Sequence, residues 1–157
     1  CVDWGMSEMQ RIVTEAADRE QIPLQKIARA IRVYLEYFDQ NPHCVELLIQ
    51  ERAMFKHRKR GAYFEHREEL RDIFRVLYSQ LVDEGVFRSD LPVERLLDAV
   101  GSLLYGTMLA TNAVGRTITL DEQYHAVMAT ALGGLMTRAG EHQLQGLLST
   151  IKTSADC

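Results

Sequence analysis

The sequence predicts an all-α domain, a helical bundle of about six helices. Strand-like alternation of apolar and polar residues is nearly absent, and the turn-forming residues fall between segments of helical length. Within these segments apolar residues recur at intervals of three and four, as on one face of a helix. With 157 residues, 46% of them hydrophobic, the chain can bury a substantial core. We assign residues 1–140 to one domain and residues 141–157 to a C-terminal tail, a weak helix or disordered.

The first two helices are predicted from the residues at their starts. A helix over roughly 7–19 follows from Ser7 and Gln10, which are spaced as a possible capping box; a start upstream of Ser7 is left open. A helix over 23–40 opens with Pro23, because proline suits the first helical turn. Its apolar face comprises Ile27, Ile31, Leu35 and Phe38.

The third and fourth helices are separated by a basic run. Asn41 can cap a helix over 42–55. The next helix begins near Gly61 and ends before Gly85, a residue suited to the left-handed turn that closes a helix. Its inward stripe contains one charged residue and comprises Tyr63, Arg67, Leu70, Phe74, Leu77 and Leu81.

The last two helices are predicted over 92–115 and 119–138. Thr119 and Glu122 have the spacing of a capping box, which marks the start of the second of them. Glycines at 101, 106, 133 and 134 fall inside these helical segments, although glycine costs a helix about 1 kcal/mol relative to alanine. Their presence indicates a close approach of two helices, which small side chains permit.

Two stretches near the end of the chain, 99–115 and 126–137, carry no charge. A helix packed from one side shows a charged face to water, so these segments are expected to be covered on both sides. A membrane span needs about 20 largely apolar residues, which neither stretch supplies. A larger core or a second copy of the chain remains as the cover.

Composition narrows the class of protein. The net charge of −4 does not favour binding to nucleic acid, whose phosphates are neutralised by Lys and Arg. The three cysteines form neither a disulfide framework nor a metal-ligand pattern. No secretory signal is visible at the start. We therefore expect a cytoplasmic protein that neither spans nor binds a membrane.

Enzymatic motifs are weak. Glu122 and His125 share a helix face, but a di-iron site needs two such pairs and two further glutamates. Cys44 and His43 are adjacent in sequence without facing each other on a helix. Phosphate-binding glycine loops are missing, and the basic run over 56–60 is offset by neighbouring glutamates. We expect no enzyme activity, no catalytic residue, no metal and no cofactor.

A group of aromatic and polar residues on otherwise buried faces favours a ligand pocket. Aromatic walls with a few fixed polar groups are typical of such sites. The candidate ligand-binding residues are Tyr34, Tyr37, Arg52, Phe55, Tyr63, Arg67, Phe74, Tyr78, Tyr105, Met108 and Asn112.

Most of the chain resembles the C-terminal ligand-binding and dimerisation domain of TetR-type transcriptional regulators. The resemblance is carried by ERAMFKHRKRGAYFEHREELRD, LYSQLVDEGVFRSDLPVERLLDAVGSLLYGTM and GRTITLDEQ, preceded by PLQKIARAIRVYLEYFDQNPH. It covers roughly residues 20–138, and the order and lengths of the predicted helices agree with it.

The resemblance implies a homodimer in which the last two long helices of each subunit form an intersubunit four-helix bundle. The preceding helices would enclose a pocket for an unknown small-molecule effector. Within the helix over 92–115, Tyr105, Met108 and Asn112 are expected to face that pocket. The residues that match the dimer helices are Leu97, Val100, Leu104, Thr107, Thr111, Tyr124, Val127, Met128, Ala131, Leu132, Leu135 and Met136.

The resemblance also implies a repressor, the commoner mode of the family, whose affinity for operator DNA is altered by the effector. Activators and ligand-dependent repressors also occur in the family, and the sequence does not distinguish these modes. DNA would be bound by an N-terminal helix-turn-helix that this chain does not include upstream of Trp4. No residue of the chain is assigned to a base or phosphate. Two alternatives remain: a metal-dependent helical enzyme that uses Glu122 and His125, and a helical scaffold that binds a different protein.

Overall fold

The all-α prediction is confirmed. A computed structural model describes residues 2–54 and 61–155, which form seven α-helices and no strand longer than an isolated bridge. The helices are α1 (Val2–Asp18), α2 (Pro23–Gln40), α3 (Pro42–Met54), α4 (Ala62–Asp83), α5 (Val93–Val114), α6 (Leu120–Gly133) and α7 (Arg138–Ala155).

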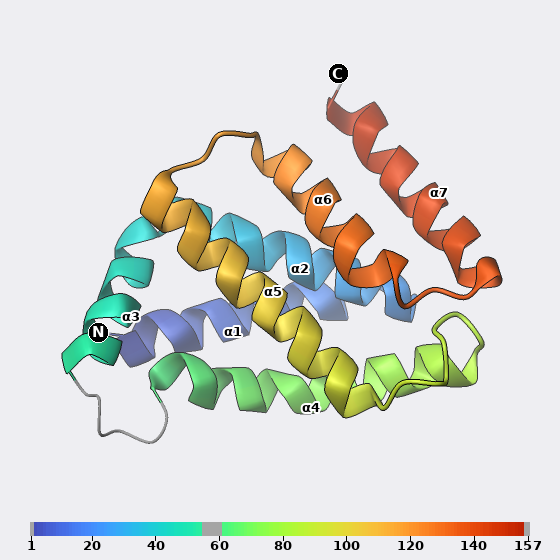
Figure 1. The fold of residues 1–157 in the computed structure, drawn as a ribbon, viewed down its shortest axis with the longest axis horizontal. Coiled ribbons are helices and arrows are strands. Elements are labelled where there is room, and N and C mark those ends of the chain that lie inside the picture. Colours follow the sequence, from blue (N-terminus) through green and yellow to red (C-terminus); the bar gives the residue numbers. More distant parts are fainter. Residues whose placement is uncertain (1, 55–60, 156–157) are drawn as a thin grey trace.

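The helices form two layers (Figure 1). In the rear layer α1 packs against α2 and α4. α5 crosses diagonally in front and packs on α4 and α3, while α6 lies beside it and packs on α2. α7 lies at the outer edge and contacts α6. The core between the layers includes Met6, Met9, Tyr78, Phe87 and Met128, each less than 3% exposed.

Several helix boundaries follow the local signals. The Thr119 hydroxyl accepts a hydrogen bond from the Glu122 amide at 3.2 Å, and the Glu122 carboxylate accepts one from the Thr119 amide at 2.8 Å. This confirms the predicted capping box. Gly85 has φ +72° after the end of α4, in the left-handed region that glycine enters without strain. Pro23 occupies the first turn of α2, as predicted.

The first helix differs from its prediction. α1 begins at Val2 rather than near Ser7, so Ser7 and Gln10 lie inside the helix and form no capping box. Met6, Met9 and Val13 are buried along one face of α1, and this face continues the helix toward its start. Packing of an apolar stripe therefore outweighs a weak local start signal.

The predicted helix over 119–138 ends earlier than predicted. α6 ends at Gly133, and residues 135–137 pair with the turn after α4. The Arg88 amide donates to the carbonyl of Leu135 at 2.8 Å, and the Thr137 amide donates to that of Val86 at 2.9 Å. These hydrogen bonds, together with the low helix propensity of two consecutive glycines, end α6 early.

The C-terminal segment is helical. Residues 138–155 form α7, an 18-residue helix that includes most of the segment predicted as a weak helix or a disordered tail. Leu144 is buried, and Leu147 and Leu148 are partly buried against the core, at the i, i+3, i+4 spacing of one helix face. In the described residues, no helix is long and apolar enough to cross a membrane.

Candidate ligand-binding site

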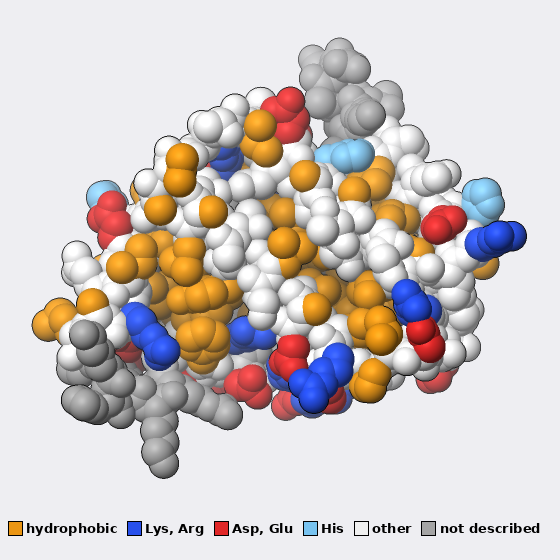
Figure 2. Space-filling model, in the orientation of Figure 1, with side chains coloured by type: hydrophobic (Ala, Val, Ile, Leu, Met, Phe, Trp, Pro, Cys, Tyr) orange, Lys and Arg blue, Asp and Glu red, His pale blue; other side chains and the backbone are white. Residues whose placement is uncertain are grey.

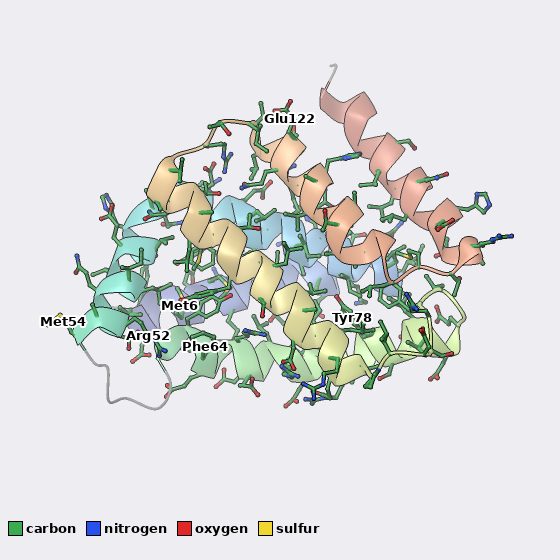
Figure 3. The ribbon with its side chains drawn as sticks, in the orientation of Figure 1. Met6, Arg52, Met54, Phe64, Tyr78 and Glu122 are labelled. Carbon is green, nitrogen blue, oxygen red and sulfur yellow. The ribbon has the colours of Figure 1, made fainter. Side chains whose placement is uncertain are left out.

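A cavity of about 100 Å³ lies between α1, α2, α4 and α5. Each helix turns its apolar stripe toward it, and α4 contributes the largest share of the lining residues. The lining comprises Met9, Val13, Ile27, Ala30, Ile31, Tyr34, Tyr63, Arg67, Leu70, Arg71, Phe74, Tyr78, Leu97, Val100, Gly101 and Leu104. Figure 3 labels Phe64 and Tyr78, which lie near opposite ends of α4; Tyr78 belongs to the lining of the cavity.

Two buried tyrosines place hydroxyl groups together between α2 and α4. The hydroxyl oxygens of Tyr34 and Tyr63 are 2.9 Å apart and share a hydrogen bond. Burial raises the pKa of Tyr34 well above its ordinary value. Burial also raises the pKa of Tyr63 to about 12, against the opposing effects of the bond to Tyr34 and of Arg67. Both hydroxyls are therefore neutral near pH 7, and each carries a hydrogen to donate.

Two arginines of α4 lie in the wall, in different electrostatic states. Arg71 donates to the carboxylates of Glu94 and Asp98 at 2.7 and 2.6 Å. Arg67, one turn earlier, makes no hydrogen bond or ion pair with any residue that the structure describes. Its guanidinium carbon lies 6.0 Å from the ring centroid of Phe64. The wall thus holds one neutralised and one unpaired cation.

Gly101 of α5 makes room for the unpaired guanidinium. A Cβ atom built at Gly101 would lie within 2.8 Å of three guanidinium atoms of Arg67. The glycine therefore leaves space for this side chain between α4 and α5. At the other helical glycines of the prediction, Gly106, Gly133 and Gly134, a built Cβ would meet nothing within 4 Å, so no close approach of a second helix is present there in the described chain.

The structure brings together five of the eleven predicted ligand-binding residues, Tyr34, Tyr63, Arg67, Phe74 and Tyr78. Four others lie elsewhere. Arg52 and Tyr105 line a smaller neighbouring pocket, and Met108 and Asn112 line a separate cavity of about 270 Å³ beside α3.

The last two predicted residues do not contribute to the cavity that is described. Tyr37 points away from it and donates a hydrogen bond to the carbonyl of Gly5 at 2.7 Å. Phe55 lies outside the described residues. Sequence reasoning missed Met9 and Val13 of α1, because an apolar helix stripe does not distinguish a cavity wall from a filled core.

The predicted dimer residues lie mostly inside the chain. Nine of the twelve are buried in the core of one subunit: Leu97, Val100, Tyr124, Val127, Met128, Ala131, Leu132, Leu135 and Met136. Leu104, Thr107 and Thr111 are half-buried. Val100 and Leu104 line the cavity, and the Tyr124 hydroxyl donates to the Ala28 carbonyl of α2 at 3.2 Å. The most buried of these residues are thus already covered by their own subunit.

A different stripe of α5 and α6 faces outward. It consists of small uncharged residues, Ala99, Ser102, Gly106, Ala110 and Ala113 on α5 and Ala126, Ala129 and Thr130 on α6, all exposed. We call this surface the small-residue face. Figure 2 views the side on which α5 and α6 lie, where most charged side chains are near the rim.

The metal hypothesis finds no support in the described part of the chain. Residues 2–54 and 61–155 contain no group of three or more His, Cys, Asp or Glu side chains that could hold a metal ion. Glu122 is engaged in the capping box of α6, whose hydrogen bonds lower its pKa.

Fold and cavity together define an all-α ligand-binding domain of the kind found in transcriptional regulators. The family model described as "Tetracyclin repressor-like, C-terminal domain" matches residues 23–130, more than half of the chain. The chain belongs to this family and is the effector-sensing regulatory domain of a transcriptional regulator.

A solved structure supports the fold. The ketosteroid transcriptional regulator KstR2 of Mycobacterium tuberculosis is similar to this chain with a TM-score of 0.67 and 20% sequence identity. The similarity covers 87% of this chain and 72% of that one. No curated protein sequence matches the chain.

Proposed function

We propose that the chain senses a small molecule in the cavity between α1, α2, α4 and α5 and dimerises through the small-residue face. Binding would alter the affinity of a preceding helix-turn-helix for operator DNA, with the ligand relieving repression. The observation that carries this proposal is the position of the cavity. One wall belongs to α1, the first helix of the chain, and the opposite wall belongs to α5, which carries most of the small-residue face.

A ligand in this position would contact both α1 and α5, the two elements that a repressor must couple. A ligand shifts an equilibrium between two arrangements only as far as it binds one of them better. Met9 and Val13 on α1 and Val100 on α5 touch the same cavity, so a ligand that fits one relative position of these helices favours that position. A dimer that binds two half-sites is sensitive to such shifts, because the half-sites have a set spacing.

The small-residue face supports dimerisation. Its residues project little beyond the backbone, which allows two helices to approach closely. It also lacks charged side chains whose desolvation would oppose association. We propose α5 and α6 of each subunit as the intersubunit four-helix bundle, with contacts through this outward face.

Binding of a small neutral apolar ligand tests the sensing function. Calorimetric titration should show that benzene binds the chain, and Val100→Phe, which fills the cavity from α5, should abolish binding. Val76→Phe, on an exposed position of α4, is the control and should bind as the unaltered chain does. Sedimentation of the same samples should show dimers at micromolar concentration. Undiminished binding by Val100→Phe would refute the cavity as the sensing site.

A further inference from the structure

The cavity wall carries a positive charge that nothing described in the chain neutralises. Arginines occur on α4 at 67, 71 and 75. Arg71 pairs with Glu94 and Asp98, and Arg75 pairs with Glu94 and Asp72. Arg67 has no such partner among the residues that the structure describes, although it is half-buried and lines the cavity. Of the three arginines on α4, Arg67 alone lacks an ion pair among the described residues.

The nearby acidic group is already engaged. The pKa of Asp98 is lowered mainly by its hydrogen bond with Arg71, and Arg67 adds a weaker effect. The Asp98 carboxylate accepts from Arg71 at 2.6 Å, and no ion pair joins it to Arg67 among the described side chains. A partly desolvated cation without a counter-ion is unfavourable. An anion bound in the cavity would therefore be stabilised by the charge of Arg67.

The remaining polar groups of the wall are also donors. Tyr34 and Tyr63 carry two hydroxyl hydrogens, and one of them forms the bond between the two oxygens. The sulfur of Met108, 3.8 Å from the Tyr34 oxygen, is a weak acceptor for the other. No Asp or Glu is among the residues that line the cavity in the described chain. The wall thus offers donors and a positive charge inside an apolar surface, which suits a ligand with an acceptor and a negative charge.

We propose that the cavity binds a small organic acid with an apolar body and a single carboxylate, and that Arg67 binds the carboxylate. This inference rests on the proposed function of the cavity as the effector site. One unpaired guanidinium neutralises one charge, and its planar fork matches a carboxylate. A phosphate dianion would leave a second charge uncompensated.

The size of the cavity limits the apolar body. A volume of about 100 Å³ is below the range of drug-sized pockets, roughly 300–1,000 Å³. It is closer to an engineered protein cavity of about 150 Å³ that holds benzene. A single ring or a short branched chain is therefore the expected body, and 3-phenylpropionate is a suitable probe. Its alcohol, 3-phenylpropan-1-ol, has the same body without the charge.

Calorimetric titration of the purified chain with these two probes tests the proposal. We expect the acid to bind at least tenfold more tightly than the alcohol, since a hydrogen bond to a charged group accounts for about a tenfold to hundredfold difference in affinity. Arg67→Met keeps much of the side-chain length and removes the charge. It should reduce the preference to near one while leaving the alcohol affinity unchanged. Arg75→Met, at a half-buried position on the same helix that does not line the cavity, should retain the full preference.

A second variant displaces the arginine without removing it. In Gly101→Ala the new Cβ would occupy the space of the Arg67 guanidinium, so the side chain must move. This variant should also lose acid preference. It keeps the proposal testable if Arg67→Met does not fold.

The outcomes separate this proposal from the function on which it rests. Equal binding of acid and alcohol, or a preference for acid that survives in Arg67→Met, overturns the role of Arg67 and leaves the cavity as a ligand site. Tighter binding of 3-phenylpropyl phosphate than of 3-phenylpropionate overturns the single-carboxylate assignment. Failure of both probes and of benzene to bind overturns both proposals.

Discussion

The hydroxyl of Tyr37 donates a hydrogen bond to the carbonyl oxygen of Gly5, 2.7 Å away, and so joins α2 to α1. The contact is buried, and burial raises the pKa of Tyr37. A Cβ built at Gly5 would lie 3.1 Å from the sulfur of Cys44, so α1, α2 and α3 meet closely at this point. Because α1 also forms part of the cavity wall, this bond helps to set the position of that wall.

Removal of the Tyr37 hydroxyl should loosen α1. Tyr37→Phe is expected to lower the free energy of unfolding by about 1 kcal/mol, the usual net value of a buried hydrogen bond. The melting temperature should fall by roughly 2–4 °C. Amide exchange in α1 should accelerate. Tyr78→Phe is the control, because the described residues provide no hydrogen bond to that buried hydroxyl. Equal losses in the two variants would contradict the role given to Tyr37.

The small-residue face provides a sharper test of dimerisation than the buried stripe. Ala131 is only 7% exposed, so Ala131→Arg would unfold the subunit rather than separate a dimer. A Cβ built at Gly106 meets no atom within 4 Å, so Gly106→Arg leaves the subunit intact and obstructs a partner. Sedimentation at micromolar concentration should show a monomer of unchanged helicity. Val76→Arg, 67% exposed on α4, should remain dimeric. A dimeric Gly106→Arg protein would exclude this face.

Acid should weaken the ion pairs that join α4 to α5. Hydrogen bonds from Arg75 and Arg71 lower the pKa of Glu94 from 4.5 to about 2. A carboxyl group with a depressed pKa stabilises the fold above its ordinary pKa, and that contribution is lost as the pH falls from about 4.5 toward 2. Melting curves over this interval should show a smaller decrease for Glu94→Gln than for the unaltered chain. Asp83→Asn, at the exposed end of α4, should follow the unaltered chain. Parallel curves for all three proteins would disprove the assignment.

The capping box of α6 should contribute measurably to stability. Thr119→Ala removes the side-chain acceptor for the Glu122 amide and is expected to lower the free energy of unfolding by about 1 kcal/mol. Thr117→Ala, on an exposed residue of the preceding loop, is the matched control and should change little. Chemical denaturation of both variants measures the difference. The prediction fails if the two have the same midpoint.

Much of the fold could be predicted from sequence because its signals are local. Pro23, Gly85 and the Thr119–Glu122 pair mark the boundaries of helices through their own backbone and side-chain chemistry. Boundaries that depend on distant contacts were predicted less well. α6 ends at Gly133 because residues 135–137 pair with the turn at 86–88, nearly 50 residues earlier in the chain. No local pattern contains that information.

The candidate site was also predicted only where local signals were sufficient. Helical spacing predicted that Tyr63, Arg67 and Phe74 share one face of α4, and they do line one cavity. It could not show that Tyr37 turns toward Gly5, or that Met108 lies beside a different cavity from most of the predicted set. Those outcomes depend on which neighbouring helix packs against the face that carries each residue.

The sequence by itself determined most of the helices, the family and the existence of two charge-free segments. Only the tertiary structure decided which face of each is covered: the buried stripes of α5 and α6 pack inside their own subunit, and the small residues face outward. The tertiary structure also decided that Arg67 has no ion-pair partner among the described residues, while Arg71, one turn away, pairs with two carboxylates. The physical reason is that the spacing of apolar residues indicates only which face of a single helix is buried. Partners, free volume and charge balance arise from residues that the chain brings together from distant positions.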